Sequence, residues 1–148
     1  MKEQALEILD RNDPIPVVLV CILNGGFMFF SDLVKQITVP IEIDFIRCKS
    51  YYGKKQGDLV VTKDLETKIK NKHVYLVDDI LDSGNTMKAV AKFLQVKEPK
   101  TITPVAAIYK ENLDFDKVLH ILKQDTDSMF DPWYIGYGMD DEKGHNRN

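Results

Sequence analysis

Three carboxylates gather at one point of the sequence, directly before a turn of small polar residues. Residues 74–90, VYLVDDILDSGNTMKAV, begin as an apolar strand, continue through Asp78, Asp79 and Asp82, and end as an amphipathic helix. Carboxylates this close repel one another and raise each other's pKa, so we expect a bound group to compensate them. The alternative is that Asp82 or Ser83 merely caps the helix, which explains one acidic residue but not the pair before it.

The turn after the carboxylates has the composition of a phosphate-binding loop. Gly84 permits close approach of the backbone, Ser83 and Thr86 carry hydroxyls, and consecutive N–H groups lead into a helix N-terminus, which favours an anion. The spacing differs from the dinucleotide-binding fingerprint and from the Walker loop, so neither NAD nor an ATPase is indicated. We expect a phosphomonoester to bind at Asp82, Ser83, Gly84, Asn85 and Thr86.

An α/β domain with a mostly parallel central sheet, flanked by helices, is needed to position these residues. Apolar runs predict strands at 17–23, 41–49, 59–62, 73–77, 102–109 and 133–138 and helices at 27–36 and 83–95. Strands that alternate with helices place ligands at the carboxyl ends of parallel strands. Residues 41–49 and 59–62 form an antiparallel hairpin with a polar tip, and Ile41, Ile43 and Phe45 share one face of it.

Composition predicts a single cytoplasmic domain, residues 1–148. Twenty basic and 23 acidic residues give a net charge of −3, which provides no general field for nucleic acid or for an anionic membrane. No apolar run approaches the roughly 20 residues that span a membrane, and no leader pattern opens the sequence. Cys21 and Cys48 lie in apolar stretches and are interpreted as small buried hydrophobic residues, not as a disulfide or zinc site.

The segment VDDILDSGNT, residues 77–86, resembles the phosphoribosyl pyrophosphate motif of type I phosphoribosyltransferases. The resemblance implies that Asp78 and Asp79 hold the ribose hydroxyls and that the following loop cradles the 5′-phosphate. That motif occurs in enzymes for several bases and in some regulators, so the acceptor must be inferred from other segments. Four of these resemble the hypoxanthine-guanine group of the family.

Two of the four segments concern pyrophosphate and the exclusion of water. LNGGFMFFSDL, residues 23–33, resembles the pyrophosphate loop, and Asn24 stands where the group commonly has lysine. Asn24, Gly25 and Gly26 would bind pyrophosphate, and in the family the peptide bond before this asparagine position is often cis. IDFIRCKSYYG, residues 43–53, resembles the catalytic lid, in which Ser50 and Tyr51 fold over the reacting centre. The alternatives are a simple Asn-Gly-Gly turn and an ordinary exposed hairpin.

The other two segments concern the base. VAAIYK ends on Lys110, which matches the lysine that the family places against the purine 6-oxo group; a lone lysine at a strand end is otherwise merely solvated. DPWYIGYGMD, residues 131–140, resembles a segment in which Trp133 stacks on the purine and Tyr134 offers backbone groups to it. The alternative is that Trp133 belongs to the core.

The same resemblance extends to the metal and to one arginine. It implies that Asp140 meets the metal-pyrophosphate region near the purine, so that the candidate Mg2+ ligands are Asp78, Asp79 and Asp140. Arg147 follows at a spacing one residue longer than is common and is assigned to pyrophosphate. The resemblance runs from about Val17 to Asp140. Family members generally continue at both ends, so the chain is either a compact variant or is clipped.

The activity implied by the resemblance is purine salvage. With Mg2+, phosphoribosyl would pass from phosphoribosyl pyrophosphate to a 6-oxopurine, hypoxanthine or guanine, giving IMP or GMP and pyrophosphate, and Asp82 would handle the proton at purine N7. The alternatives are a xanthine-preferring enzyme, a regulator that binds phosphoribosyl pyrophosphate, and an inactive fragment. No nucleic-acid or membrane partner is expected. The family commonly forms dimers or tetramers, so a homodimer or homotetramer is expected.

Overall fold

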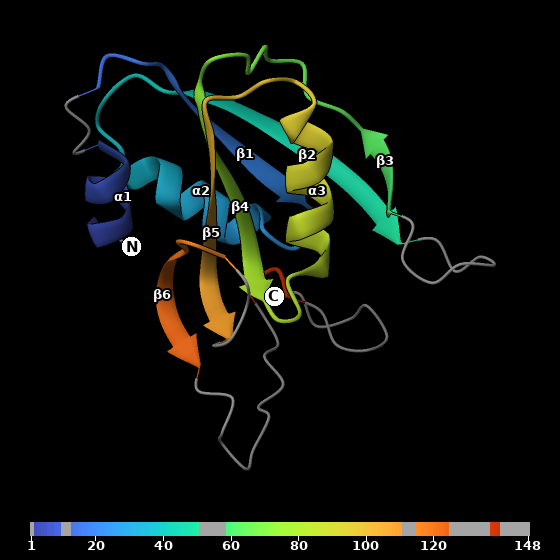
Figure 1. Cartoon of the computed structure of the whole chain (residues 1–148). Helices are drawn as coiled ribbons and strands as arrows, with labels where there is room; N and C mark the ends of the chain where they lie inside the picture. Colours follow the sequence, from blue (N-terminus) through green and yellow to red (C-terminus); the bar gives the residue numbers. More distant parts are fainter. Residues whose placement is uncertain (1, 10–12, 51–58, 111–114, 125–136, 140–148) are drawn as a thin grey trace.

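One mixed sheet organises the part of the chain that the computed structural model describes, residues 2–9, 13–50, 59–110, 115–124 and 137–139 (Figure 1). The strands lie in the order β3-β2-β1-β4-β5-β6, and all neighbours are parallel except the antiparallel pair β2 and β3. The helices and strands are α1 (Lys2–Leu9), β1 (Val17–Leu23), α2 (Phe27–Gln36), β2 (Glu42–Ser50), β3 (Leu59–Lys63), β4 (His73–Leu81), α3 (Asn85–Gln95), β5 (Thr101–Lys110) and β6 (Leu119–Gln124).

The helices cover both faces of the sheet because side chains alternate along its central strands. In β1, Val18 and Val20 pack in a buried cluster with α3, while Leu19 and Cys21 pack in a second cluster with α1 and α2. Successive side chains of a strand point to opposite faces, so a continuous apolar run such as β1 requires cover on both. The predicted α/β fold, with helices on a mostly parallel sheet and an antiparallel strand pair, is confirmed.

Element boundaries at the carboxyl edge differ from the predicted ones. Strand β4 continues past the predicted end at Val77 to Leu81, which lies opposite Tyr109 of β5, so Asp78 and Asp79 belong to the strand. Backbone pairing with β5 maintains the strand where the apolar pattern stops. Helix α3 begins at Asn85, not at Ser83, because Gly84 takes a left-handed conformation immediately before it.

Two elements were not predicted, and one prediction was wrong over its last residues. Helix α1 and strand β6 had no sequence signal strong enough to be recognised; in β6 only Leu119 is buried. The strand predicted at 133–138 lies mostly outside the described residues, but Tyr137 and Gly138 form a turn there. Gly138 has φ +89°, a value that ends regular strand geometry.

The predicted apolar face of β2 is only partly buried. Ile41 and Phe45 pack against the cluster under α2, and the Phe45 ring lies 5.4 Å from that of Phe30 of α2, whereas Ile43 is exposed. The opposite face carries buried Asp44 and Ile46. Within the described residues, no helix is both long enough and apolar enough to cross a membrane.

Candidate active site at the carboxyl edge of the sheet

Three segments that are distant in sequence meet where the parallel strands β1, β4 and β5 end. The turn Asn24–Gly26 follows β1, Asp82–Gly84 follows β4, and Lys110 is the last residue of β5. Strand β4 pairs with both neighbours, so these ends share one edge of the sheet, at the bottom of Figure 1. All predicted site residues that the structure describes lie at this edge, including Ser50, which ends β2, a strand parallel to β1; its side chain lies outside the described residues.

The glycine turn after β1 lies directly against the acidic pair of β4. A Cβ on Gly25 would come 2.6 Å from Asp79 Oδ2, and one on Gly26 would lie 3.1 Å from the Asp78 Cα. Only glycine allows approach this close without displacing a neighbour. The Leu23–Asn24 peptide bond is cis, as the resemblance implied, and Asn24 is exposed. The turn therefore presents its backbone beside two carboxylates.

Asp78 and Asp79 form a crowded, half-buried acidic pair. Asp78 Oδ1 accepts a hydrogen bond from the Asp79 amide at 2.9 Å, and Asp79 Oδ1 accepts one from Ile80 N at 2.8 Å. Burial, together with the adjacent Asp79 charge, raises the pKa of Asp78 well above its ordinary value. Among the described residues neither carboxylate forms an ion pair, and a cation bound beside them would favour ionisation of both groups.

The sulfur atoms near this pair are protonated and inert. Burial, followed by the charges of Asp78 and Asp79, raises the pKa of Cys21 to about 12. Burial and Asp78 also raise the pKa of the half-buried Cys48. Both cysteines are free thiols. The interpretation of Cys21 as a small buried hydrophobic residue is confirmed, and Cys48 is half-buried.

The acidic pair offers oxygen ligands of the kind that Mg2+ prefers, but it does not complete a metal site. Among the described residues, no three His, Cys, Asp or Glu side chains come together in a group able to hold a metal ion. Mg2+ is commonly held by one or two carboxylates, water and substrate phosphates. Asp78 and Asp79 fit this pattern, while the third predicted ligand, Asp140, lies outside the described residues.

The loop after β4 leads directly into the N-terminus of α3. Gly84 has φ +72°, which favours glycine, and its carbonyl accepts the first helical bond, from Lys88 N at 2.8 Å. The N-cap residue Gly84 supplies no side-chain cap, no acidic residue occupies the first turn, and the Asn85 amide donates one long hydrogen bond, 3.4 Å, to Ser83 Oγ. These features suit an anion better than the alternative of a self-capped helix.

A cation from β5 reaches across to the loop after β4. Lys110 Nζ lies 2.8 Å from Asp82 Oδ1. The lysine side chain is 15% exposed and the aspartate 68% exposed. Lys110 is therefore not a simply solvated lysine: its ammonium forms a donor–acceptor pair with Asp82, the first residue after β4.

Several predicted site residues are not placed. Tyr51, Trp133, Tyr134, Asp140 and Arg147 lie outside the described residues, so the lid, the stacking ring and the arginine stay predictions. One contact at this edge was not anticipated: Tyr137 Oη donates a hydrogen bond to Asp32 Oδ2 of α2 at 2.6 Å. The two residues are 105 positions apart, and no pattern in the sequence pairs them.

Comparison with known proteins places this edge in context. Residues 3–142 match the family described as the phosphoribosyl transferase domain. The chain belongs to the phosphoribosyltransferase family. Relatives within this family include a hypoxanthine-guanine phosphoribosyltransferase of Staphylococcus aureus, 34% identical over 94% of this chain and 78% of the relative. A hypoxanthine-guanine-xanthine phosphoribosyltransferase of Tritrichomonas foetus is 37% identical over 69% of this chain and 56% of the relative.

The phosphoribosyltransferase fold is also found in solved structures. A crystal structure of a hypoxanthine phosphoribosyltransferase from Staphylococcus aureus superposes with a TM-score of 0.85 at 32% identity, covering 99% of this chain and 79% of that one. The sheet described above is therefore that of a phosphoribosyltransferase fold. The chain spans about half of the length of the Tritrichomonas relative and about four fifths of the Staphylococcus proteins.

Proposed function

We propose that this chain transfers phosphoribosyl from phosphoribosyl pyrophosphate to a 6-oxopurine, hypoxanthine or guanine, giving IMP or GMP and pyrophosphate in purine salvage. The pairing of Lys110 with Asp82 at 2.8 Å carries the proposal. The Staphylococcus relative, named for hypoxanthine and guanine, supports the choice of base.

The donor–acceptor pair complements one edge of an oxopurine. Lys110 would donate to the 6-oxo oxygen, and Asp82 would accept the proton at N7 as the ring attacks ribose C1. The two groups lie side by side, and binding of the base would replace their direct 2.8 Å contact with one contact to the 6-oxo oxygen and one to N7. Adenine presents a 6-amino group instead, which would leave Lys110 with a donor opposite a donor.

The phosphoribosyl donor would lie along the rest of the edge. The amides at the start of α3, with the hydroxyls of Ser83 and Thr86, would bind the 5′-phosphate. Asp78 and Asp79 would hold the ribose hydroxyls, and the backbone of the Asn24–Gly26 turn would bind pyrophosphate. These roles follow from the family resemblance and from the proximity of the Asn24–Gly26 turn to Asp78 and Asp79.

Mg2+ is part of this proposal. Asp78 and Asp79, with the predicted ligand Asp140, would hold the ion, which when bound neutralises charge on the leaving pyrophosphate. The raised pKa of Asp78 supports this assignment, because a site with uncompensated carboxylates favours a cation. The carboxylates themselves would keep negative charge close to the ribose ring as it becomes positive.

A xanthine-preferring enzyme is the second candidate. It is supported by the Tritrichomonas relative, whose name includes xanthine. Xanthine shares the oxo group at C6 and differs at C2, a position that the sequence assigns to the surroundings of Tyr134. The single domain, the cytoplasmic location and the homodimer or homotetramer expected from the sequence stay predictions.

A spectrophotometric assay with phosphoribosyl pyrophosphate and Mg2+ tests the proposal. Hypoxanthine, guanine, xanthine and adenine are supplied separately to the purified chain and to Lys110→Met. We expect the native chain to turn over the oxopurines and not adenine, and Lys110→Met to lose roughly ten- to a thousandfold of kcat/KM for oxopurines. Turnover of adenine would contradict the role of Lys110. Donor binding without turnover of any base would favour a regulator or an inactive fragment.

A further inference from the structure

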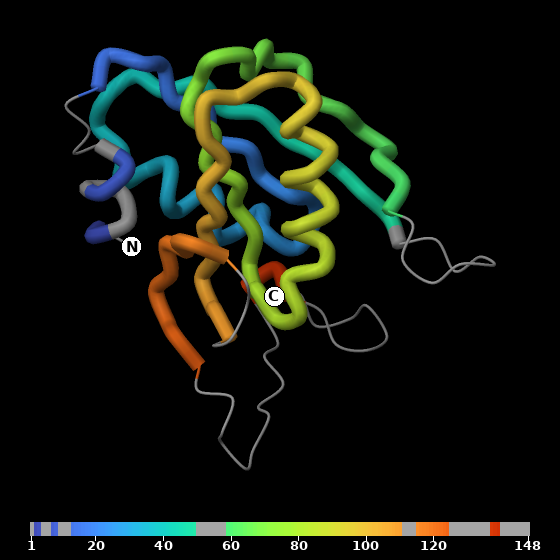
Figure 2. The backbone as a smooth tube through the Cα atoms, viewed as in Figure 1, coloured from blue at the N-terminus to red at the C-terminus, as the bar shows by residue number. Residues whose placement is uncertain are grey.

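Residues 137–139 lie against the glycine turn that follows β1. A Cβ on Gly138 would come 2.6 Å from the Gly25 carbonyl oxygen and 3.3 Å from Met28 Cγ. Gly138 has φ +89°, and the next residue, Met139, is buried in the cluster beneath α2. Figure 2 shows this short segment, in red, at the carboxyl edge of the sheet. The backbone of residue 138 is therefore in direct contact with the turn.

A hydrogen bond attaches this segment to the helix that the turn begins. Tyr137 Oη donates to Asp32 Oδ2 at 2.6 Å, and the Tyr137 ring packs against the cluster beneath α2. Burial and the Asp32 carboxylate raise the pKa of Tyr137 to about 12, so the hydroxyl keeps its proton at neutral pH. Tyr137 has φ +53°, a conformation that a residue with a side chain adopts only where its surroundings hold it.

The two backbone hydrogen bonds that close the turn are long, although the Gly26 carbonyl accepts a bond of ordinary length, 2.9 Å, from Phe30 N of α2. The bonds from Gly26 N to Ile22 O and from Phe27 N to Asn24 O are both 3.3 Å long. Backbone hydrogen bonds are usually about 2.9–3.0 Å. The N-cap residue of α2 is Gly26, which has no side chain to cap the helix. Support from outside the turn therefore comes from Asp79, which faces the Cβ position of Gly25, and from Gly138, which faces its carbonyl.

We propose that Tyr137 is a positioning residue for the pyrophosphate end of the donor. Its hydrogen bond to Asp32 holds residues 137–139 against Gly25, and this contact fixes the backbone of Asn24–Gly26 for pyrophosphate. The inference rests on the proposed function, since it assigns the turn to the donor. It predicts that removal of the Tyr137 hydroxyl, which does not touch the reacting atoms, weakens binding of phosphoribosyl pyrophosphate and leaves binding of the base unchanged.

A stability role alone would give a different result. Asp32 is 40% exposed and also pairs with exposed Lys35 at 3.0 Å, so water can replace the Tyr137 hydroxyl without burying a charge. We therefore expect Tyr137→Phe to unfold close to the native temperature. If Tyr137 only stabilised the fold, its substitution would lower the unfolding temperature and leave the donor Kd of the folded protein unchanged.

The test compares Tyr137→Phe and Asp32→Ala with their double variant, and uses Lys35→Ala as the matched control. Isothermal titration with phosphoribosyl pyrophosphate and Mg2+ gives the donor Kd, and steady-state kinetics give kcat and the KM of the base. We expect a rise of roughly three- to tenfold in donor Kd for each single variant, with no further rise in the double variant. The base KM should stay within about twofold, and Lys35→Ala should match the native chain.

Hydrogen exchange supplies a readout that does not depend on turnover. Amides of residues 24–30 should exchange faster in Tyr137→Phe than in the native chain or in Lys35→Ala. An unchanged donor Kd, or a double variant whose effects add, would overturn the inference and leave the proposed activity standing. If the native chain binds the donor but turns over no base, the proposed activity fails, while weaker donor binding by Tyr137→Phe still supports the inference.

Discussion

Asp82 is highly exposed and is the residue to which we assign proton transfer at purine N7. Its carboxylate is 68% exposed and contacts Lys110. We expect Asp82→Asn to lower kcat by roughly 10²–10⁴, the usual contribution of general acid–base catalysis, with little change in donor Kd. The free energy of unfolding should change by less than about 1 kcal/mol, because exposed ion pairs contribute little. Steady-state kinetics and urea unfolding of the same preparation measure both effects.

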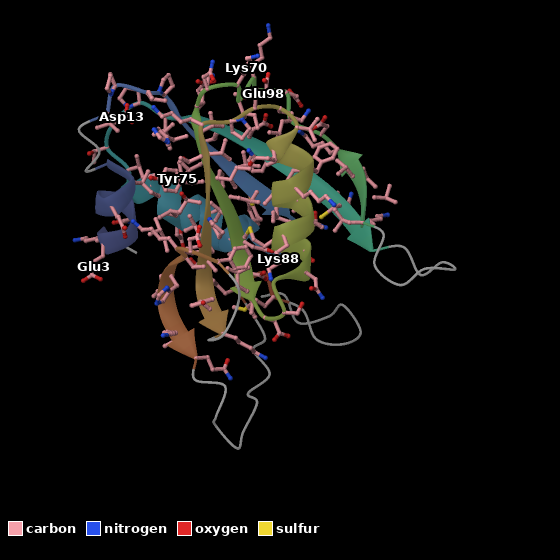
Figure 3. The ribbon with its side chains drawn as sticks, in the orientation of Figure 1. Glu3, Asp13, Lys70, Tyr75, Lys88 and Glu98 are labelled. Carbon is pink, nitrogen blue, oxygen red and sulfur yellow. The ribbon has the colours of Figure 1, made fainter. Side chains whose placement is uncertain are left out.

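A distant ion pair provides the control for Asp82. Lys70 and Glu98 are paired and exposed at the opposite edge of the sheet (Figure 3). Glu98→Gln removes a carboxylate of similar exposure and should leave kcat within about twofold of the native value. A normal kcat in Asp82→Asn, or an equal loss in Glu98→Gln, would remove the proton-handling role from Asp82.

The raised pKa of Asp78 predicts a stability that depends on pH. The folded protein holds the Asp78 proton more tightly than the unfolded chain does, so stability falls as pH rises above the ordinary value of 3.8. Asn cannot ionise, and its oxygen can still accept from the Asp79 amide. We expect Asp78→Asn, in buffer with EDTA, to unfold at a higher temperature than the native chain, by an amount that grows from pH 4 to pH 8. A gain independent of pH would show that ionisation of Asp78 does not destabilise the fold.

Single residues were predictable where a local pattern carried the chemistry. The acidic pair and the glycine after it could be recognised in one short segment, and Lys110 could be assigned through the family resemblance. Buried Asp44 could not, because its carboxylate accepts hydrogen bonds from the amides of Glu66 and Thr67, which only the fold brings near. The Tyr137–Asp32 contact escaped for the same reason.

At the scale of elements, the two glycines that join β1 to α2 should respond differently to the same substitution. The Cβ of Gly25→Ala meets the terminal oxygen of Asp79, which can rotate away, whereas that of Gly26→Ala meets the backbone of Asp78, Ile22 and Val77. We expect Gly25→Ala to lower kcat/KM for the donor by roughly ten- to a hundredfold while folding normally. Gly26→Ala should lower the free energy of unfolding by about 1–3 kcal/mol.

Chemical denaturation and donor kinetics of both glycine variants separate these effects. Because Gly26 has φ −64°, its backbone conformation suits alanine, so any loss there comes from crowding. Equal stability loss in the two variants would mean that the Asp79 side chain cannot move. Normal donor kinetics in Gly25→Ala would mean that the position of Asp79 does not matter for the donor.

Helices and strands were predictable from the sequence where burial of their side chains produces a clear apolar pattern. Strand β1 is apolar throughout and was predicted with its observed bounds, since both of its faces are covered. Strand β4 was ended too early because Asp78 and Asp79 interrupt its apolar run, while backbone pairing with β5 continues to Leu81. Strand β6 was missed because most of its side chains are not buried, so it has little apolar pattern.

At the scale of the whole molecule, the two edges of the sheet have different polar groups. Within the described residues, the carboxyl edge carries acidic and backbone groups with few hydrogen-bond or ion-pair partners. The amino edge carries a closed network: His73, 3% exposed, has Nε2 3.0 Å from Asp13 Oδ2 and Nδ1 2.7 Å from Thr101 Oγ1. The network joins the starts of β4 and β5 to the segment before β1, the region around Asp13 in Figure 3. This division predicts that stability and activity can be changed separately.

The last prediction tests that division at His73. His73→Ala leaves a buried gap and removes a partner from both Asp13 and Thr101, so we expect the free energy of unfolding to fall by about 2–4 kcal/mol. Thr101→Val keeps the shape and removes one hydroxyl, so its loss should be smaller, about 1 kcal/mol. Both variants should keep kcat and both KM values within about twofold at a temperature where they are folded, because the network lies at the edge opposite to the site.

Unfolding at low pH provides a second test of the His73 network. The hydrogen bonds from His73 and from the Ile15 amide hold the pKa of Asp13 below its ordinary value of 3.8. A lowered pKa in the folded state adds stability above pH 3.8, and this stability is lost as pH falls through the folded value. Urea unfolding at several pH values should therefore show that the difference between native and His73→Ala narrows in acid. A constant difference would assign the loss to the gap alone, and a fall in kcat at neutral pH would show that the two edges are coupled.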